Sequence, residues 1–399
     1  MTEPSTAADT ADAMALNALG MQALGRADLN AARDFFARAA AADPDAPPLW
    51  INLATAQRGM DDVEGERASL TRVLGIDQRH LMANIRLGEL HERLGETGQA
   101  TQRWSAVAAI SQLIPEVPAN LVSVFAHANA FVAEQGARFG ALVDQGLAEA
   151  RGGIDAPERR RVDAAVDALL GRRRIFHNEC ASLHVPFLPA DEFFERRHFP
   201  WMAEIEARTD AIRAEFEALV SESLEGFVPY VAMESGIPQN KWSGLDHSLD
   251  WASFFLWRFG ERIDEACARC PETAKALEAL PLADMPKRAP TAFFSVLKPG
   301  VRLPAHTGVS NARAIVHLPL IIPPGCALRV GGETREWRIG EAFAFDDTIE
   351  HEAWNESDQL RAVLIFDVWN PHISEEERAL LRTFFSVADD SGFAVAASD

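Results

Sequence analysis

The sequence predicts two parts: an N-terminal all-α solenoid of helical repeats, and a C-terminal antiparallel β domain of the small-barrel or jelly-roll type. Two observations carry this prediction. Small and apolar residues recur at a period of about 34 residues over the first third of the chain. Short apolar runs separated by tight turns follow residue 291. The length of 399 residues is ample for two or more domains.

The repeat pattern lies in residues 13–114 and has the tetratricopeptide length. Gly20, Ala54 and Gly88 stand at the eighth position of the three units, where one helix must approach the next closely. The second unit matches less well, because Glu66 takes the place of a small residue. A generic helical bundle is the alternative interpretation.

Residues 115–178 keep a helical pattern but lose the repeat, so we expect a linker or a cap of the solenoid. Two arginine runs, 159–161 and 172–174, are interpreted as solvated faces beside a short helix. Residues 1–12 are expected to be disordered and residues 389–399 to be frayed.

Residues 179–388 are assigned to the globular β domain. Helices are predicted at 202–224, 272–280 and 375–387. Strands are predicted at 250–257, 293–297, 314–322, 327–330, 334–338, 341–345 and 360–368. Gly331 and Gly332 indicate a hairpin between two of these strands.

The composition limits the partners and the compartment. A net charge of -21 argues against nucleic acid, which binds positive surfaces. No apolar run is long enough to span a bilayer, and residues 1–15 lack the features of a signal peptide, so we expect a cytoplasmic protein. The four cysteines fit a reducing compartment. Cys267 and Cys270 have no second cysteine pair, and are interpreted as thiols near a helix surface rather than zinc ligands.

Two histidines are candidate metal ligands. His306 stands in a His-x-Gly motif and His351 follows a predicted strand, and neutral imidazoles suit Fe(II). In a jelly roll, the positions of these two histidines can converge at one open end of the barrel. Many non-haem iron sites add a carboxylate two residues after the first histidine, but this chain has Gly308. Asp346 and Asp347 are other candidate carboxylates, although they fit orienting a ligand or capping a turn equally well.

Arg361 interrupts an otherwise apolar strand, and a buried arginine needs an anionic partner. That partner is either an acidic side chain in a structural ion pair, or a ligand carboxylate that the guanidinium grips through two oxygens. Ser295, in another apolar strand, could add a hydroxyl donor. His317 also breaks an apolar strand, and by itself it fits a satisfied core histidine.

Five segments resemble the aspartyl/asparaginyl β-hydroxylase family, a branch of the 2-oxoglutarate-dependent oxygenases. They are Phe294–Gly300, His306–Asn311, His317–Pro323, Gly340–His351 and Val368–Pro371. The resemblance covers roughly residues 180–385, and tetratricopeptide-like helices precede the oxygenase domain in this family. It implies a double-stranded β-helix that holds Fe(II).

The resemblance also implies roles for the candidate residues. His306 and His351 match the two metal ligands, which are the catalytic residues. Arg361 and Ser295 match residues that bind the distal carboxylate of 2-oxoglutarate. His317 matches a histidine near the metal-bound end of that cosubstrate.

Two further positions bear on the metal and on the substrate. Glycine at the carboxylate position is a trait of the family, so Gly308 supports the resemblance, which implies that water fills the vacant coordination position. Arg313 matches one of two arginines that animal members place in this strand, and is the candidate substrate-binding residue. The second of these arginine positions is Ile315 in this chain. This departure from the family pattern bears on whether the substrate residue is acidic and on part of the cosubstrate pocket.

The expected activity follows from this resemblance. It is an Fe(II)-dependent dioxygenase that uses 2-oxoglutarate and O2, releases succinate and CO2, and hydroxylates the β-carbon of an Asp/Asn-type residue in a peptide or protein. The N-terminal repeats would recruit that protein. One alternative is the same chemistry on a small peptide metabolite or a lipid acyl chain, and another is a non-catalytic adaptor with a degenerate barrel.

Overall fold

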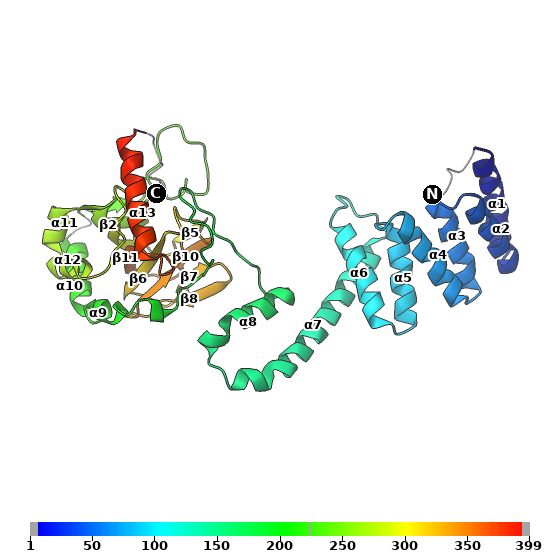
Figure 1. Cartoon of the computed structure of the whole chain (residues 1–399), viewed down its shortest axis with the longest axis horizontal. Coiled ribbons are helices and arrows are strands. Elements are labelled where there is room, and N and C mark those ends of the chain that lie inside the picture. Colours follow the sequence, from blue (N-terminus) through cyan, green and yellow to red (C-terminus); the bar gives the residue numbers. More distant parts are fainter. Residues whose placement is uncertain (1–6, 223–224, 393–399) are drawn as a thin grey trace. The chain divides into compact units, whose positions relative to one another are not determined.

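The computed structural model describes residues 7–222 and 225–392 and divides into two compact units, one ending at Asp155 and the other beginning at Ala156 (Figure 1). Parts of the predicted disordered and frayed ends, residues 1–6 and 393–399, lie outside the described residues. The domain boundaries inferred from the sequence remain predictions.

Three helix pairs and one long helix make up the described part of the N-terminal unit (Figure 1). The pairs are α1 (Ala7–Gly25) with α2 (Leu29–Ala42), α3 (Pro47–Gly59) with α4 (Val63–Ile76), and α5 (Leu81–Arg93) with α6 (Thr97–Ser111). Each helix packs against the one before it, and α7 (Val122–Gly152) packs on α6. This stacking is the tetratricopeptide-like arrangement that the sequence predicted.

Small residues set the spacing of the helix pairs. A Cβ at Gly20 would come within 2.5 Å of the Phe36 ring, and one at Gly88 within 2.8 Å of the Trp104 ring. Both rings are buried. Ala54, the equivalent residue of the second pair, is fully buried as well. The repeat in the sequence is therefore the repeat of these close helix contacts.

Glu66, the residue that departs from the repeat pattern, is nevertheless buried. Its exposed fraction is 1%, and Arg93 Nη2 donates to its Oε2 at 2.6 Å. Arg93 belongs to the next helix pair, so an ion pair occupies a place that a small residue fills elsewhere.

Two antiparallel sheets form the centre of the C-terminal unit (Figure 1). The seven-stranded sheet has the order β1 (Val228–Pro229), β2 (Trp251–Arg258), β4 (Ala292–Leu297), β11 (Arg361–Trp369), β6 (Arg313–Ile321) and β9 (Phe343–Phe345), with β3 (Glu261–Arg262) beside β2. The four-stranded sheet has the order β5 (Arg302–His306), β10 (His351–Asn355), β7 (Cys326–Val330) and β8 (Glu333–Glu336). The predicted hairpin is the β7–β8 pair.

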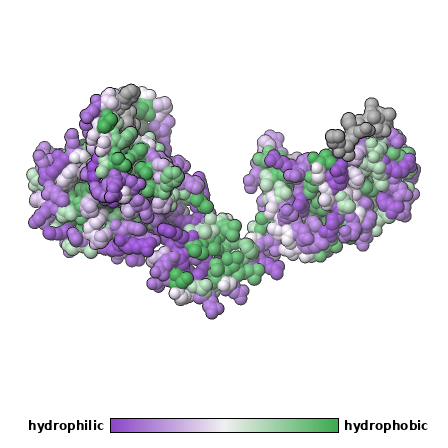
Figure 2. Space-filling model, in the orientation of Figure 1, coloured by the Kyte–Doolittle hydropathy of each residue, from purple (hydrophilic) through white to green (hydrophobic). Residues whose placement is uncertain are grey.

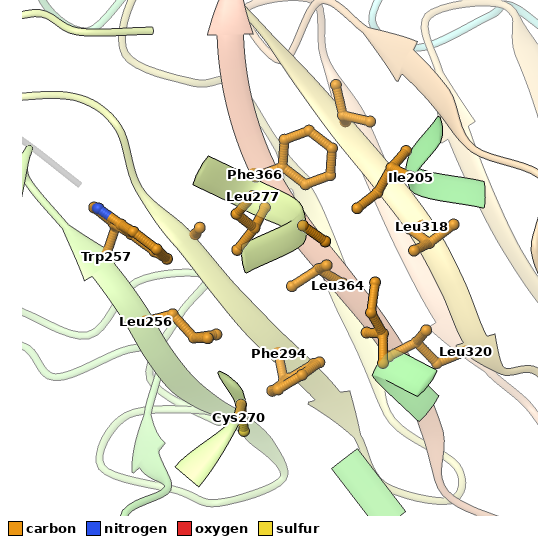
Figure 3. Close-up of a cluster of buried hydrophobic side chains, with 14 of the residues drawn as sticks. Ile205, Leu256, Trp257, Cys270, Leu277, Phe294, Leu318, Leu320, Leu364 and Phe366 are labelled. Atoms are coloured by element: carbon orange, nitrogen blue, oxygen red, sulfur yellow. The ribbon is translucent and has the colours of Figure 1, made fainter. Parts of the chain in front are cut away.

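One face of the seven-stranded sheet is covered by helices. Figure 3 shows Phe294, Leu318 and Leu364 of three neighbouring strands packed with Ile205 and Leu277 from these helices. The helices are α9 (Met202–Glu206), α10 (Thr209–Glu222), α11 (Asp264–Arg269) and α12 (Pro271–Glu278). Because side chains alternate along a strand, the residues between these apolar ones point to the opposite face.

The opposite face turns toward the four-stranded sheet. Leu297 and Val363 of the larger sheet share a buried cluster with Leu328 and Ala353 of the smaller one. Both faces of the central strands are therefore buried, which explains their nearly continuous apolar sequence. The space between the sheets is where the predicted site residues lie.

Two local predictions about the helical layer are wrong. Residues 202–222 form two helices rather than one, because the chain turns at residues 207–208, where the carbonyl of Glu206 accepts from Thr209 Oγ1 instead of continuing the helix. Residue 224 of that prediction lies outside the described residues. Cys267 and Cys270 are buried under the helical layer instead of lying near a surface, because the short helix α11 packs on β2.

Helix α8 (Ala156–Leu169) precedes the sheets within the C-terminal unit. Arg160 donates to Asp191 Oδ1 at 2.9 Å and to the carbonyl of Phe193 at 2.7 Å. The interpretation of residues 159–161 as wholly solvated is therefore wrong for Arg160, because its guanidinium anchors α8 to a loop of the same unit.

The visible surface of the C-terminal unit is largely hydrophilic (Figure 2). The last helix, α13 (Glu375–Asp390), keeps Leu380 and Phe384 exposed on one side and buries Phe385 on the other. Within residues 7–222 and 225–392, no helix combines the length and apolar character needed to cross a bilayer.

Candidate active site

The two candidate metal ligands face each other on neighbouring strands. His306 is the last residue of β5 and His351 the first residue of β10, and the strand register pairs them directly. Their ring centroids lie 4.0 Å apart. In the described part of the chain, no group of three or more histidine, cysteine or acidic residues could hold a metal ion. The structure therefore places the two candidate histidine ligands side by side.

Each of these imidazole rings is oriented by a backbone carbonyl. His306 Nδ1 lies 2.7 Å from the carbonyl oxygen of Pro304, and His351 Nδ1 lies 3.0 Å from that of Ile349. A carbonyl oxygen only accepts, so each Nδ1 carries the proton and each Nε2 keeps its lone pair. Burial lowers the pKa of His306 to about 4 and that of His351 well below its usual value. Both rings are thus neutral at pH 7 and suited to bind a metal through Nε2.

The structure explains why residue 308 is glycine. A Cβ at Gly308 would overlap the carboxyl group of Asp347. Asp347 is buried, and its Oδ1 has no hydrogen-bond partner among the described residues. Burial raises the pKa of Asp347 to about 7, against the opposing effect of the Arg313 charge. A carboxyl group from position 347 therefore occupies the space that a carboxylate at position 308 would need.

Asp346 has a different environment from its neighbour. Its Oδ1 accepts hydrogen bonds from Thr348 N at 3.0 Å and Thr348 Oγ1 at 2.6 Å, and its Oδ2 accepts one from Asn178 Nδ2 at 2.7 Å. Asp346 thus caps the turn that leads into His351.

Arg361 lies between the two sheets with an exposed fraction of 1%. Its Nη1 donates to Ser295 Oγ at 3.3 Å, and Ser295 Oγ also accepts from Trp251 Nε1 at 3.2 Å. Its Nε has no partner in the described part of the chain, and no acidic residue there forms an ion pair with it. Burial lowers the pKa of Arg361 to about 10. The structural ion pair left open by the sequence is therefore not found among these residues.

His317 connects the arginine to the histidine pair. It is buried, and its pKa is lowered well below the usual value by burial and then by the charges of Arg361 and His351. Its Nδ1 accepts a hydrogen bond from Trp337 Nε1 at 3.2 Å. The structure thus brings His317 and Arg361 to one region between the sheets, near His351.

Trp337 is a site residue that the sequence analysis missed. It follows β8 directly, is 4% exposed, and lies with its ring centroid 4.3 Å from the guanidinium carbon of Arg361. The available signal was one aromatic residue among the charged residues of segment 334–338.

A loop between β1 and β2 covers His306, and it too was missed. Trp242 packs edge-on against the His306 ring with centroids 4.9 Å apart. Lys241 Nζ donates to the carbonyl of Ala305 at 2.8 Å.

Arg313, the candidate substrate-binding residue, is already paired. Its Nη1 lies 2.8 Å from Asp367 Oδ2, and Asp367 is 1% exposed and also accepts from Thr291 N at 2.8 Å. Ile315 is the cross-strand neighbour of Asp367 and packs against the apolar cluster between the sheets. In this region the chain presents a neutralised arginine and an apolar side chain.

The sequence of the C-terminal unit is similar to that of known proteins. Residues 206–371 match the model of the family described as aspartyl/asparaginyl beta-hydroxylase. The resemblance inferred from the sequence is thereby confirmed over the C-terminal sheets and most of their covering helices.

Three curated relatives show the extent of this similarity. Human aspartyl/asparaginyl beta-hydroxylase is 38% identical over 33% of this chain and 17% of its own length. The ornithine lipid ester-linked acyl 2-hydroxylase of Rhizobium tropici is 35% identical over 45% of this chain and 60% of its own length. Human aspartate beta-hydroxylase domain-containing protein 2 is 32% identical over 51% of this chain and 53% of its own length. The chain thus spans less than two thirds of each relative.

Solved structures with similarity include the Arabidopsis OM64 tetratricopeptide domain, which is 15% identical and covers 32% of this chain and 98% of that one, at a TM-score of 0.28. Because this TM-score is low, the assignment of the repeats rests on the helix packing of this chain itself.

Proposed function

We propose that this protein is an Fe(II)- and 2-oxoglutarate-dependent dioxygenase that hydroxylates an unactivated C–H bond. In this proposal the two facing antiparallel sheets are a double-stranded β-helix of the jelly-roll type. The family match over residues 206–371 and the pairing of His306 with His351 support it.

The buried Arg361 is the observation that carries the proposal. A fully buried cation without an acidic partner is unfavourable in an empty site, because desolvation is not repaid. A ligand carboxylate between the sheets would supply the missing charge, with Ser295 Oγ beside it. The residues therefore fit a small dicarboxylate whose second end lies near the histidines.

The chain's own residues would divide the work as follows. His306 and His351 would hold Fe(II) through their Nε2 atoms, and His317 would contact the metal-proximal end of 2-oxoglutarate. The bound iron and cosubstrate would supply the oxidation of the C–H bond, with release of succinate and CO2. Trp242, packed on His306, would help exclude water from this region.

The preferred substrate is a peptide or protein, hydroxylated at the β-carbon of an Asp/Asn-type residue. The name of the human relative and the N-terminal repeats support this choice, because stacked helix pairs provide an extended surface for protein binding. We further propose a cytoplasmic location, which fits four free cysteines.

A lipid acyl chain is the second candidate substrate, and a specific observation favours it. Arg313 is neutralised by Asp367, and Ile315 is apolar, so neither offers a free cation to an acidic substrate residue. The similarity to the Rhizobium tropici acyl hydroxylase points the same way.

The proposed function is tested by incubating the protein with Fe(II), 2-oxoglutarate and cell extract. We expect succinate formation and a one-oxygen mass gain on a protein or lipid, both absent from the His351→Ala control. Deleting residues 1–114 should keep uncoupled succinate formation and reduce modification of a protein substrate. Absence of Mn(II) and 2-oxoglutarate binding to the wild-type protein would favour the non-catalytic adaptor instead.

A further inference from the structure

Trp337 contacts two residues of the proposed cosubstrate site at once. Its indole N–H donates to His317 Nδ1 at 3.2 Å, and its ring face lies 4.3 Å from the guanidinium carbon of Arg361. The His317 and Trp337 rings are nearly parallel, with an interplanar angle of 17°. The buried Trp337 side chain thus contacts both His317, the proposed hydrogen-bond donor to the ligand, and Arg361, its proposed charged partner.

The direction of the hydrogen bond determines the state of His317. An indole N–H can only donate, so His317 Nδ1 must accept and cannot carry a proton. The neutral ring then carries its proton on Nε2, at the other side of the imidazole. In the described part of the chain, no residue accepts a hydrogen bond from this Nε2. His317 Nε2–H is therefore a donor without a protein acceptor among the described residues.

We propose that Trp337 is a positioning residue that presents His317 Nε2–H, together with the Arg361 guanidinium, to an anionic ligand between the sheets. This inference rests on the proposed function for the identity of that ligand, 2-oxoglutarate. His317 would donate to an oxygen at the metal-proximal end, while Arg361 binds the distal carboxylate.

The size of the effect follows from counting ring states. A neutral imidazole has two tautomers and two orientations of its ring, and one of these four arrangements presents Nε2–H to the ligand. If the indole N–H selects that arrangement, its loss leaves about a quarter of the molecules competent, and binding weakens about fourfold. Loss of the aromatic face as well would also release Arg361 and weaken binding further.

The first measurement needs no ligand and no variant of Trp337. In the full-length metal-free protein, 15N chemical shifts of histidine ring nitrogens distinguish protonated from unprotonated positions, and His317→Gln identifies the signals. We expect an unprotonated Nδ1 and a protonated Nε2. A protonated Nδ1 would overturn the inference, whatever the cosubstrate is.

The second measurement is the affinity for 2-oxoglutarate in the presence of Mn(II), determined by calorimetry. We expect Trp337→Phe, which keeps the aromatic face, to weaken binding about fourfold, and Trp337→Leu to weaken it more. In a His317→Ala background, Trp337→Phe should have no further effect, because the indole N–H then has no partner. An equal loss in both backgrounds would contradict the positioning role.

Trp354→Phe is the matched control, because Trp354 also stacks with an arginine, Arg302 at 4.5 Å, but is not buried. It should leave the affinity unchanged. If the wild-type protein binds no 2-oxoglutarate, the proposed function fails, and the histidine chemical shifts alone decide the role of Trp337.

Discussion

Replacing Arg361 by methionine should make the metal-free protein more stable and, at the same time, unable to respond to 2-oxoglutarate. The guanidinium is 1% exposed and has no acidic partner among the described residues. An apolar residue of similar length removes the buried charge and keeps most of the volume. The same charge is what the proposed cosubstrate needs, so stability and binding should change in opposite directions.

The magnitude comes from the pKa of Arg361. Burial lowers it from 12.5 to about 10, and this difference corresponds to about 3 kcal/mol of unfavourable free energy. At pH 7 the guanidinium is protonated in the folded and unfolded states, so the folded state carries the whole cost. The hydrogen bond to Ser295 offsets about 1 kcal/mol. We therefore expect a gain of about 2 kcal/mol, or about 4–8 °C in melting temperature for a unit of this size.

The assay is thermal denaturation with and without Mn(II) and 2-oxoglutarate. The wild-type protein should be stabilised by the ligand, whereas Arg361→Met should melt at a higher temperature alone and gain nothing from the ligand. Arg313→Met is the matched control, because it breaks the buried pair with Asp367 and should destabilise by about 3–5 kcal/mol. An Arg361→Met protein that melts lower and still responds to 2-oxoglutarate would refute this reasoning.

Three more predictions follow from close contacts and burial. Gly308→Asp should weaken Mn(II) binding and lower the stability, because its Cβ overlaps the carboxyl group of Asp347. Adding Asp347→Gly should restore both the affinity measured by calorimetry and the melting temperature. A double variant that stays as impaired as Gly308→Asp would show that steric overlap is not the cause. Asp347→Asn should stabilise the metal-free protein by up to about 4 kcal/mol above pH 7. Because the folded pKa of about 7 lies above the unfolded value, this gain should shrink as the pH falls toward 4, and a gain independent of pH in urea denaturation would contradict it. Gly88→Ala should destabilise the N-terminal unit by about 1–3 kcal/mol through its contact with Trp104, whereas Gly136→Ala, which meets nothing within 4 Å, should be stabilising by about 1 kcal/mol in circular dichroism melts.

Much of the fold could be predicted because period and local chemistry are visible in a sequence. The spacing of Gly20, Ala54 and Gly88 predicted helix pairs, since only small residues allow those helices to approach. The apolar runs predicted the buried central strands. The short strands β5 and β10 were missed, because both carry polar residues and begin or end at a site histidine.

The candidate site was predicted less completely. His306, His351, Ser295, His317 and Arg361 were named from residue type and from family resemblance, and the structure places the first two side by side. Their roles as ligands of iron and 2-oxoglutarate remain predictions. Trp337 could not be found in this way, because its significance depends on contacts with residues 20 and 24 positions away in the sequence.

The sequence by itself determined the repeat period, the identity of the buried strands and the resemblance to the hydroxylase family, since each depends on the spacing of residues along one segment. Only the tertiary structure decided which charges are compensated. Arg313 and Arg361 look alike in the sequence, each near the start of an apolar run. Asp367 on a neighbouring strand neutralises the first, while none of the described acidic residues reaches the second. The physical reason is that pairing depends on distances across the sheet, which no local pattern records.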